Sequence, residues 1–408
     1  LGATSMRQIA LLTHQQGVFG APPSDSTVRR SLEPIGADER LPIWIARVRA
    51  RVRKHVWALI ASTEAGFPWL RVAGKVLTGW IVIDIDATLI TAHSNKQGAG
   101  ATFKKGWGFH PLACWCANTG ESLAMLLRTG SAGSNTVADH ITVLAEAIRQ
   151  IPDAYRAKLW IRVDGAGATH DLVEQMKGLN TTRRTVRFSV GWKITEIDES
   201  AIGKLPASAW QAAVRQDGTV HPHAEVTELT GLDERAAAWG VRLLVRRVRP
   251  SARDQRQLTA FEHKTGWKYA IVATNLGPRG LRGIPGSHQL AFIDAVHRDH
   301  AEVEDRVRTN KAMGLRNLPS KTWNVNVGWV LAANLAADID AWTRLLGLHD
   351  QADLARAEPA TLRFCLWHLP AKLVTHARQR LLKISVTWPW KTAFLICWQR
   401  LCALPAPG

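Results

Sequence analysis

The sequence predicts a mixed α/β protein, and three observations support this prediction. Uninterrupted β-branched runs such as WIVIDIDATLI (80–90) alternate with amphipathic helices such as TVADHITVLAEAIRQI (136–151). The chain has 408 residues, more than one average domain of ~100–200, and 46% of them are hydrophobic, enough for a large core. No apolar run reaches the ~18 residues that cross a bilayer, which argues against a membrane protein.

The charge balance indicates the kind of partner. The chain has 52 Lys and Arg residues against 34 Asp and Glu, a formal net charge of +18. Such an excess favours nucleic acid as the partner, with an anionic membrane surface as the weaker alternative. The five cysteines form no CxxC pair, so we expect buried free thiols in a reducing cytoplasm rather than a zinc site.

The pattern of elements divides the chain beyond its N-terminal region. Residues 76–192 are expected to form the first part of a sheet-based core, because three strands, a helix, a strand, a helix and a strand follow one another. Residues 193–280 interrupt this layout with short β-like runs and turns, which predicts a mostly β insertion. The core would resume at 281–322 with one long helix. Residues 323–408 are expected to be helical and basic, with no Asp or Glu after Glu358.

Residues 1–75 are expected to form a basic helical region. A first helix, a Gly/Pro turn and a second helix at 26–35 are compatible with a helix-turn-helix that contacts DNA through Arg29 and Arg30. Two helices packed on the surface are the alternative. The cationic run RVRARVRK (47–54) is expected on a helix that faces solvent or phosphate. The helix at 26–35 is expected to take its N-cap from Asp25, Ser26 or Thr27.

Carboxylates inside buried strands need an explanation, because desolvating an unpaired carboxylate is costly. Asp84 and Asp86 lie on the same face of WIVIDIDATLI, and Asp164 ends the strand LWIRVDG. Carboxylates at neighbouring strand ends can hold Mg²⁺, whereas a capped or salt-bridged strand end is the alternative. Asp84 competes with Asp86 for this role, and we prefer Asp86 because it lies at the exit of the strand.

A third carboxylate is expected from the long helix at 286–314. With about 100° per residue, Glu304 falls on a stripe beside the apolar face, whereas Glu302 and Asp305 point elsewhere. A charge that merely borders an apolar face is the alternative. The Glu304 stripe also contains His297, His300 and Lys311, and the apolar stripe contains Ile293, Val296, Val303 and Val307.

Three stretches together resemble a known protein family. They are IDIDATLITAHSNKQGAGATFKKGWGFHPL (83–112), LWIRVDGAG (159–167) and HRDHAEVEDRVRTNKAMGLRNLP (297–319). The sequence resembles bacterial insertion-sequence transposases of the Asp-Asp-Glu (DDE) type, in the group with a β insertion and a Tyr-x2-Arg-x3-Glu-x6-Lys signature (DDE group 1 transposases). The similarity runs from about Ser24 to near the C-terminus. It implies a ribonuclease-H-like catalytic core that the β insertion interrupts.

The resemblance assigns catalytic and metal-binding roles to three residues. Asp86, Asp164 and Glu304 match the DDE triad. Two Mg²⁺ ions, replaceable by Mn²⁺, are implied, with Asp86 bridging both ions, Asp164 on one and Glu304 on the other. The gap between Asp164 and Glu304 is explained by the insertion.

The resemblance also implies contacts with phosphates beside the cut site. Lys311 matches the signature lysine, whereas His297 and His300 stand where the signature has tyrosine and arginine. Most of the 18 Trp residues are expected in the core, although Trp107 or Trp192 could stack on an extruded base.

The implied activity is Mg-dependent cleavage at the ends of an insertion sequence, followed by transfer of the 3′-OH strand to target DNA. The implied partners are double-stranded DNA and a second copy in a homodimer on that DNA. No membrane partner is expected, and the implied location is the bacterial cytoplasm, at the nucleoid. Two alternatives stay open: a DNA-binding relative with impaired catalysis, suggested by His297 and His300, and a ribonuclease-H-fold nuclease without strand transfer.

Overall fold

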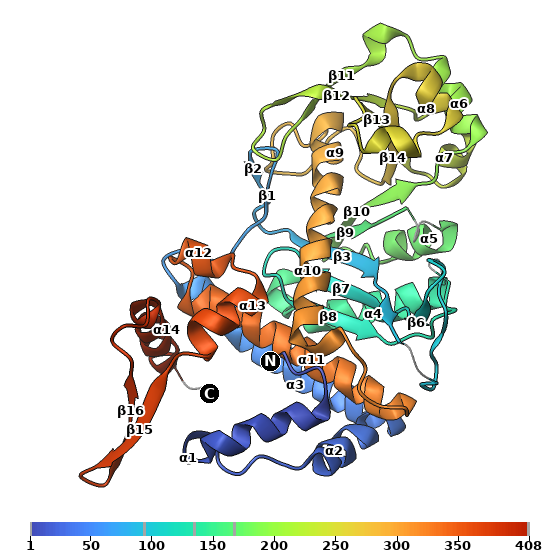
Figure 1. The fold of residues 1–408 in the computed structure, drawn as a ribbon. Coiled ribbons are helices and arrows are strands. Elements are labelled where there is room, and N and C mark those ends of the chain that lie inside the picture. The colour runs from blue at the N-terminus through green and yellow to red at the C-terminus, as the bar shows by residue number, and fades with distance from the viewer. Residues whose placement is uncertain (1, 93–94, 134–135, 166–168, 406–408) are drawn as a thin grey trace.

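The computed structural model describes residues 2–92, 95–133, 136–165 and 169–405. In this part of the chain a nine-stranded sheet forms the centre of the molecule, as the α/β prediction requires (Figure 1). The strand order is β11-β12-β13-β14-β10-β9-β3-β7-β8, in which β3, β9 and β10 are parallel and all other neighbours are antiparallel. The strands are β3 (Ile81–Ala87), β7 (Leu112–Cys116), β8 (Ser122–Leu126), β9 (Lys158–Val163), β10 (Thr185–Trp192), β11 (Gln211–Val214), β12 (Val220–Glu228), β13 (Arg242–Val248) and β14 (Lys268–Thr274).

Helices cover both faces of the sheet. On one face, Ile81, Ile83 and Ile85 of β3 pack in a single apolar cluster with side chains of α3, α4 and α5. On the other face, Val82 packs with Ile293 of α9. A strand that is buried on both faces carries apolar side chains at successive positions, which explains the uninterrupted run in the sequence. The helices are α3 (Arg40–Ser62), α4 (Val137–Gln150), α5 (His170–Gly178) and α9 (Leu290–Arg298).

The segment expected as an insertion extends the central sheet instead of forming a separate one. β14 pairs antiparallel with β10 of the core, and Ser189 lies opposite Thr274. β13, β12 and β11 follow outward in that order, at the top of Figure 1. The segment also contains short helices that the sequence reading did not predict: α6 (Glu196–Gly203), α7 (Glu234–Ala238) and α8 (Ala260–Thr265).

The N-terminal region is helical, and its second helix packs against the C-terminal region. Ser24 caps that helix by accepting a hydrogen bond from the Thr27 backbone N–H at 3.2 Å, so the expected caps were wrong by at least one residue. Gly36 lies against the Asn324 backbone of α11, which leaves no room for a side chain. The elements are the 3₁₀ helix η1 (Met6–Gln15), α1 (Gln16–Phe19), α2 (Asp25–Ala37) and, opposite α2, α11 (Trp323–Gly347).

The C-terminal region departs most from the sequence prediction. A helix expected at 362–384, with an interruption at Pro370, instead ends in a π-helical turn at Arg363–Trp367, and the part after Pro370 forms an antiparallel hairpin. Proline lacks a backbone N–H and disfavours a helical conformation in the residue before it, which explains the break. The elements are α12 (Ala352–Ala355), α13 (Pro359–Leu362), β15 (Ala371–His376), β16 (Gln379–Ile384) and α14 (Lys391–Cys402).

Smaller features complete the fold. Four of the five cysteines are buried as free thiols, which confirms that prediction, and Cys402 is exposed. Within the described residues, no helix combines the length and apolarity that crossing a bilayer requires. Two small sheets lie beside the central one: β1 (Arg71–Val72) pairs with β2 (Lys75–Val76), and β6 (Trp107–Phe109) lies between β4 (Ile90–Thr91) and β5 (Gly100–Ala101).

Candidate active site

Two aspartates lie next to each other at the carboxyl ends of β3 and β9. These strands are parallel neighbours, and Ile85 pairs with Val163. The residues that follow, Asp86 and Asp164, therefore lie side by side, Asp86 within the last residues of β3 and Asp164 just after β9. Burial, and then the charge of Asp164, raises the pKa of Asp86 to about 6. The structure thus brings two of the three sequence-predicted acids together.

The helix that carries the third acid crosses the same face of the sheet. Side chains alternate along a strand, so Asp86 shares a face with Val82, which packs against α9. The helical path continues from α9 through the 3₁₀ segment η5 (Asp299–Glu302) into α10 (Val303–Asn310). Val303 packs against Ala113 of β7, and Ala113 is the strand partner of Asp86. The start of α10 therefore lies over the edge of the aspartate pair.

Glu304 is on this helix, and its side chain is exposed. Arg308, one turn further along, has its pKa raised by Glu358, Asp305 and, to a smaller extent, Glu304. Among the residues that the structure describes, no three His, Cys, Asp or Glu side chains gather closely enough to hold a metal ion. The helix is thus placed as expected, whereas a closed three-carboxylate cluster is not formed.

Asp84, the rival of Asp86, is buried and engaged by two basic side chains. Arg162 donates to both of its carboxylate oxygens, at 2.6 Å and 2.8 Å, and His300 Nδ1 lies 2.7 Å from Oδ1. Burial alone would raise the pKa of Asp84, but Arg162 and then His300 outweigh it and lower that pKa to about 2. These contacts occupy Asp84 and leave Asp86 as the accessible acid of the strand.

Arg162 joins the two strands to the helix. Besides binding Asp84, its Nη1 donates to Asp299 Oδ2 at 2.6 Å and to the Val296 carbonyl oxygen at 2.9 Å. The sequence reading missed this residue, although an arginine inside the strand LWIRVDG gave a signal. A cation at a buried strand position needs acidic partners, and here they come from β3 and from η5.

The two histidines that were expected to contact phosphate face the sheet instead. His300 is 8% exposed and bound to Asp84. His297 is half-buried, and burial, followed by the charges of His300 and Arg162, lowers its pKa to about 3. His297 is therefore neutral near pH 7 and lacks the charge that would attract a phosphate.

The helix is not uniform, which explains why its faces differ from the sequence expectation. A 3₁₀ helix has about 120° per residue instead of about 100°, so the four residues of η5 shift the phase by about 80°. This shift rotates Glu304 and the residues after it relative to the regular helix assumed from the sequence. His300 does not need the shift, because at about 100° per residue it already lies between Val296 and Ile293 on the apolar stripe that faces the sheet. Lys311 begins a π-helical turn, where burial, then Arg316 and Lys104, lowers its pKa.

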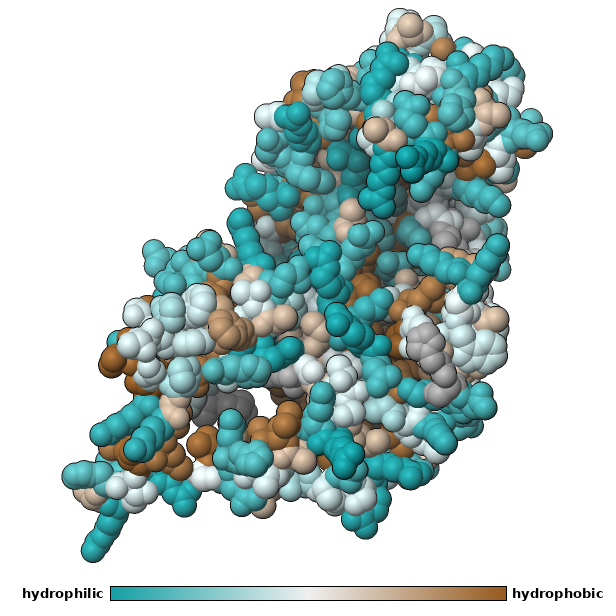
Figure 2. All heavy atoms as spheres, in the orientation of Figure 1, coloured by the Kyte–Doolittle hydropathy of each residue, from teal (hydrophilic) through white to brown (hydrophobic). Residues whose placement is uncertain are grey.

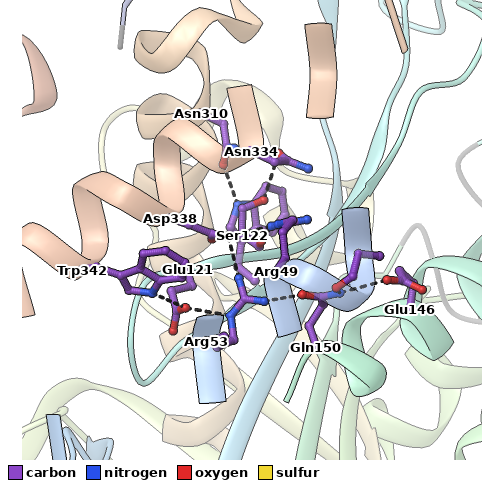
Figure 3. Close-up of polar contacts among 12 residues, drawn as sticks. Arg49, Arg53, Glu121, Ser122, Glu146, Gln150, Asn310, Asn334, Asp338 and Trp342 are labelled. Atoms are coloured by element: carbon purple, nitrogen blue, oxygen red, sulfur yellow. Dashed lines mark hydrogen bonds and ion pairs between the residues drawn. The ribbon is translucent and has the colours of Figure 1, made fainter. Parts of the chain in front are cut away.

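A separate buried network holds the far end of α10 (Figure 3). The Asn310 side-chain oxygen accepts a hydrogen bond from Trp115 Nε1 of β7 at 2.7 Å. Its amide nitrogen donates to Asn334 of α11 at 3.1 Å, and Ser122 of β8 also bonds to Asn334 at 3.1 Å. The helix with Glu304 is therefore fixed at both ends, by Arg162 at one and by Asn310 at the other.

The same network contradicts the expectation of solvent or phosphate for two residues of the RVRARVRK run, Arg49 and Arg53, whereas Arg47, Arg51 and Lys54 are exposed as expected. Arg53 is fully buried on α3 and bonds to Glu121 at 2.7 Å and Asp338 at 2.6 Å, as Figure 3 shows. Arg49 shares Asp338 at 2.8 Å. Acids within the apolar run LAADIDA could have signalled buried basic partners, because an unpaired buried carboxylate is costly.

The other predicted contact residues lie away from these networks. Arg29 and Arg30 are exposed on α2, and Arg29 lies 3.8 Å from Glu33. Trp107 is exposed and free to stack on a base, whereas Trp192 is buried against Trp239, so stacking through Trp192 is excluded in this conformation. Residues 93–94 of the stretch 83–112 and residues 166–167 of the stretch 159–167 lie outside the described residues.

The fold and the paired aspartates define a mixed α/β protein with an acidic strand-end site under a long helix. A family model described as "Transposase DDE domain group 1" matches residues 64–406, and the chain belongs to this family. The resemblance to DDE-type transposases is thereby confirmed.

One solved structure that the chain resembles is the cryo-EM structure of the piggyBac transposase synaptic complex with hairpin DNA. The TM-score is 0.39 and the identity 9%, over 69% of this chain and 51% of that one. This chain thus spans about half the length of that transposase chain. No curated protein sequence matches.

Proposed function

We propose that the protein is a transposase that cleaves DNA at transposon ends and transfers the freed 3′-OH strand to target DNA. The observation that carries the proposal is the Asp86–Asp164 pair at adjacent strand ends, in a chain of the DDE transposase family. A formal charge of +18 suits the phosphate backbone of the DNA substrate. Joining two ends in concert calls for two copies of the chain, so a homodimer on DNA is part of the proposal.

The aspartate pair fits a divalent cation. Burial, and then the charge of Asp164, disfavours the ionised form of Asp86 and raises its pKa, so Asp86 and Asp164 form a site that lacks positive charge. A divalent cation between them would favour both ionised forms. Carboxylate oxygens with open positions for water and phosphate are typical of Mg²⁺ sites, and Mn²⁺ would substitute. Held by Asp86 and Asp164, with Glu304 as the third ligand, two Mg²⁺ ions would supply activation of the attacking oxygen and stabilisation of the leaving oxygen.

In this proposal Glu304 completes the triad from the helix above the pair. It follows Val303, whose contact with Ala113 lies beside Asp86. Its side chain is exposed, and closing the triad calls for a change of its rotamer. Lys311, two turns further along the helix, would neutralise a phosphate oxygen beside the cut.

The neighbouring buried residues position the acids. Arg162 and His300 hold Asp84, and through the backbone of β3 they fix the residue two positions further on, Asp86. Arg162 also bonds to Asp299 and so fixes the position of the helix over Asp86 and Asp164. In this proposal Asp84 and His300 position other residues and transfer no proton.

The test is strand transfer by the parent protein and by the Asp164→Asn variant. A linear DNA with the ends of the protein's own element is incubated with Mg²⁺ and a target plasmid. We expect the parent to cut and join, and Asp164→Asn to lose both while it still binds DNA. The matched control is Asp153→Asn, at a side chain that is 86% exposed, which should retain both activities.

Other results would overturn the proposal in distinct ways. Cutting without joining would assign the protein to nucleases of the same fold. DNA binding without any Mg²⁺-dependent cutting by the parent would assign it to catalytically impaired relatives, for which the inward-facing His297 and His300 are the structural argument.

A further inference from the structure

The β15–β16 hairpin projects from the body of the molecule, at the lower left of Figures 1 and 2. Of its twelve strand residues, only Val374 and Ile384 are half-buried, and the others are exposed. An isolated two-stranded hairpin is marginally stable in water and buries little apolar surface. Most of its surface is therefore available to a partner.

The strand register sorts the hairpin into two faces. Lys372 lies directly opposite Lys383, so both point to the same face. On the other face, Leu373 packs against Gly17 of α1 and Arg380 donates to the Gly17 carbonyl oxygen at 3.3 Å. The second face is thus turned toward the N-terminal region, and the first face, with the lysine pair, is left outward.

The lysine pair is electrostatically unfavourable within the isolated chain. Like charges directly opposite each other destabilise a hairpin. After Glu358 the sequence contains no Asp or Glu, and among the described residues neither lysine has a carboxylate within ion-pair distance. An anionic partner would remove the repulsion.

The tip of the hairpin carries a third cation in a strained conformation. The two turn residues, Ala377 and Arg378, have φ angles of 47° and 65°. Residues other than glycine, asparagine and aspartate adopt positive φ angles at a cost in free energy. A two-residue hairpin turn therefore normally contains glycine, asparagine or aspartate. The turn therefore holds Arg378 at the extreme end of the arm where Gly would be more stable.

We propose that the β15–β16 hairpin is an arm that enters a groove of duplex DNA, with Lys372 and Lys383 on phosphates and Arg378 leading. A two-stranded ribbon fits the major groove, which is about 12 Å wide. Six residue pairs at ~3.3 Å each give an arm of about 20 Å, which is longer than the groove is wide. The arm can therefore reach the backbones of both DNA strands. The proposal deepens the proposed function, because it assigns part of the DNA contact to an element outside the catalytic site.

A second copy of the chain is a weaker occupant. Leu373 and Leu382 lie on the face that turns toward α1, whereas the outward face presents two lysines, beside Val374 and Leu381, to any identical arm. Two such faces would repel each other. The charge of the arm therefore favours DNA.

The experiment measures duplex binding without any divalent ion, so that it does not depend on catalysis. Fluorescence anisotropy of a labelled duplex is followed over a salt series for the parent and for two variants. Lys372→Gln with Lys383→Gln removes the lysine pair, and Ala377→Asn with Arg378→Gly removes the tip cation but favours the turn. We expect the log–log salt slope to fall by about 0.9 per lost phosphate contact, which is close to two for the lysine variant.

The matched control removes two exposed lysines elsewhere. Lys204→Gln with Lys264→Gln changes the net charge equally, just after α6 and on α8, and should leave the slope closer to that of the parent. Melting temperatures should not fall in any variant, because the arm lies outside the apolar clusters and both arm variants relieve an unfavourable local feature. Slopes equal to the parent's in both arm variants would overturn the proposal.

A second outcome would also overturn it. If sedimentation without DNA showed a dimer that the lysine variant dissociates, and the salt slope did not change, the arm would belong to an interface between copies. Failure of the catalytic proposal is seen separately, as cleavage that survives Asp164→Asn, and it leaves the binding result intact.

Discussion

Asp84 and His300 are 216 positions apart in the chain, yet His300 Nδ1 lies 2.7 Å from Asp84 Oδ1. The contact joins strand β3 to the helical segment that leads into Glu304. Asp84 had been the rival of Asp86 for a catalytic role. Its bonds to His300 and Arg162 give it another one, which is to hold the helix against the strand whose end presents Asp86.

Replacing His300 by alanine should weaken this junction. The change removes one bond to a buried carboxylate, and we expect a loss of about 1–3 kcal/mol in the free energy of unfolding. Urea denaturation measures it. His349→Ala, at an exposed position, is the control and should cost almost nothing. Equal stabilities of the two variants would contradict the role given to His300.

Replacing Arg162 by methionine should be more damaging. The variant leaves Asp84 and Asp299 buried without their shared cation, for which a loss of about 3–5 kcal/mol in the free energy of unfolding is typical. Arg149→Met removes an exposed pair with Glu146 and should change stability by less than about 1 kcal/mol. A similar, small loss in both variants would show that the buried contacts do not hold the helix.

Divalent-metal binding should depend on pH through Asp86. Its pKa is raised to about 6, so the carboxyl is protonated below that pH and must lose its proton to bind a cation. The raised pKa of Asp86 also affects the free energy of unfolding. It favours the folded state at low pH, and this contribution is lost as the pH rises through 6. We expect Mg²⁺ to raise the melting temperature at pH 7.5 and to have little effect at pH 5.

The control for this pH dependence is Asp164→Asn. Removing the neighbouring charge lowers the pKa of Asp86, although burial still raises it. The variant should show weaker Mg²⁺ stabilisation at pH 7.5 because it lacks one ligand. A Mg²⁺ effect of the same size at pH 5 and pH 7.5 in the parent would contradict the aspartate pair as the metal site.

The identity of the third acid can be decided by two isosteric changes on one helix. Glu304→Gln should reduce strand cleavage at least about 100-fold, which corresponds to about 2.7 kcal/mol in the activation barrier. Glu302→Gln, two positions earlier, should keep most of the activity. A loss in Glu302→Gln alone would assign the triad to Glu302, whose pKa is raised by burial and then by Asp299.

The aspartate pair could be predicted from the sequence because it rests on local rules. Alternation along a strand puts Asp84 and Asp86 on one face, and parallel neighbours end at the same edge. The position of Glu304 relative to the pair could not be predicted in the same way. That inference assumed a regular helix, and the four 3₁₀ residues of η5 change the phase before Glu304 is reached.

The remaining errors come from partners that are distant in the sequence. Arg53 was expected in solvent or on phosphate because its acidic partner Asp338 is 285 positions away. The hairpin was expected as helix because its turn uses Ala377 and Arg378, which carry no turn signal. In both cases local composition is ambiguous and tertiary contacts decide the outcome.

The close crossing of α2 and α11 has a mechanical consequence. At Gly36 and Gly328 the two backbones touch, so neither helix can shift along the other without a steric clash. α11 also carries Asp338 and Asn334, to which α3 and α10 are bonded. α11 therefore couples α2 mechanically to α10. A displacement of α2, such as binding at its exposed arginines would cause, would be transmitted through α11 to the helix that carries Glu304.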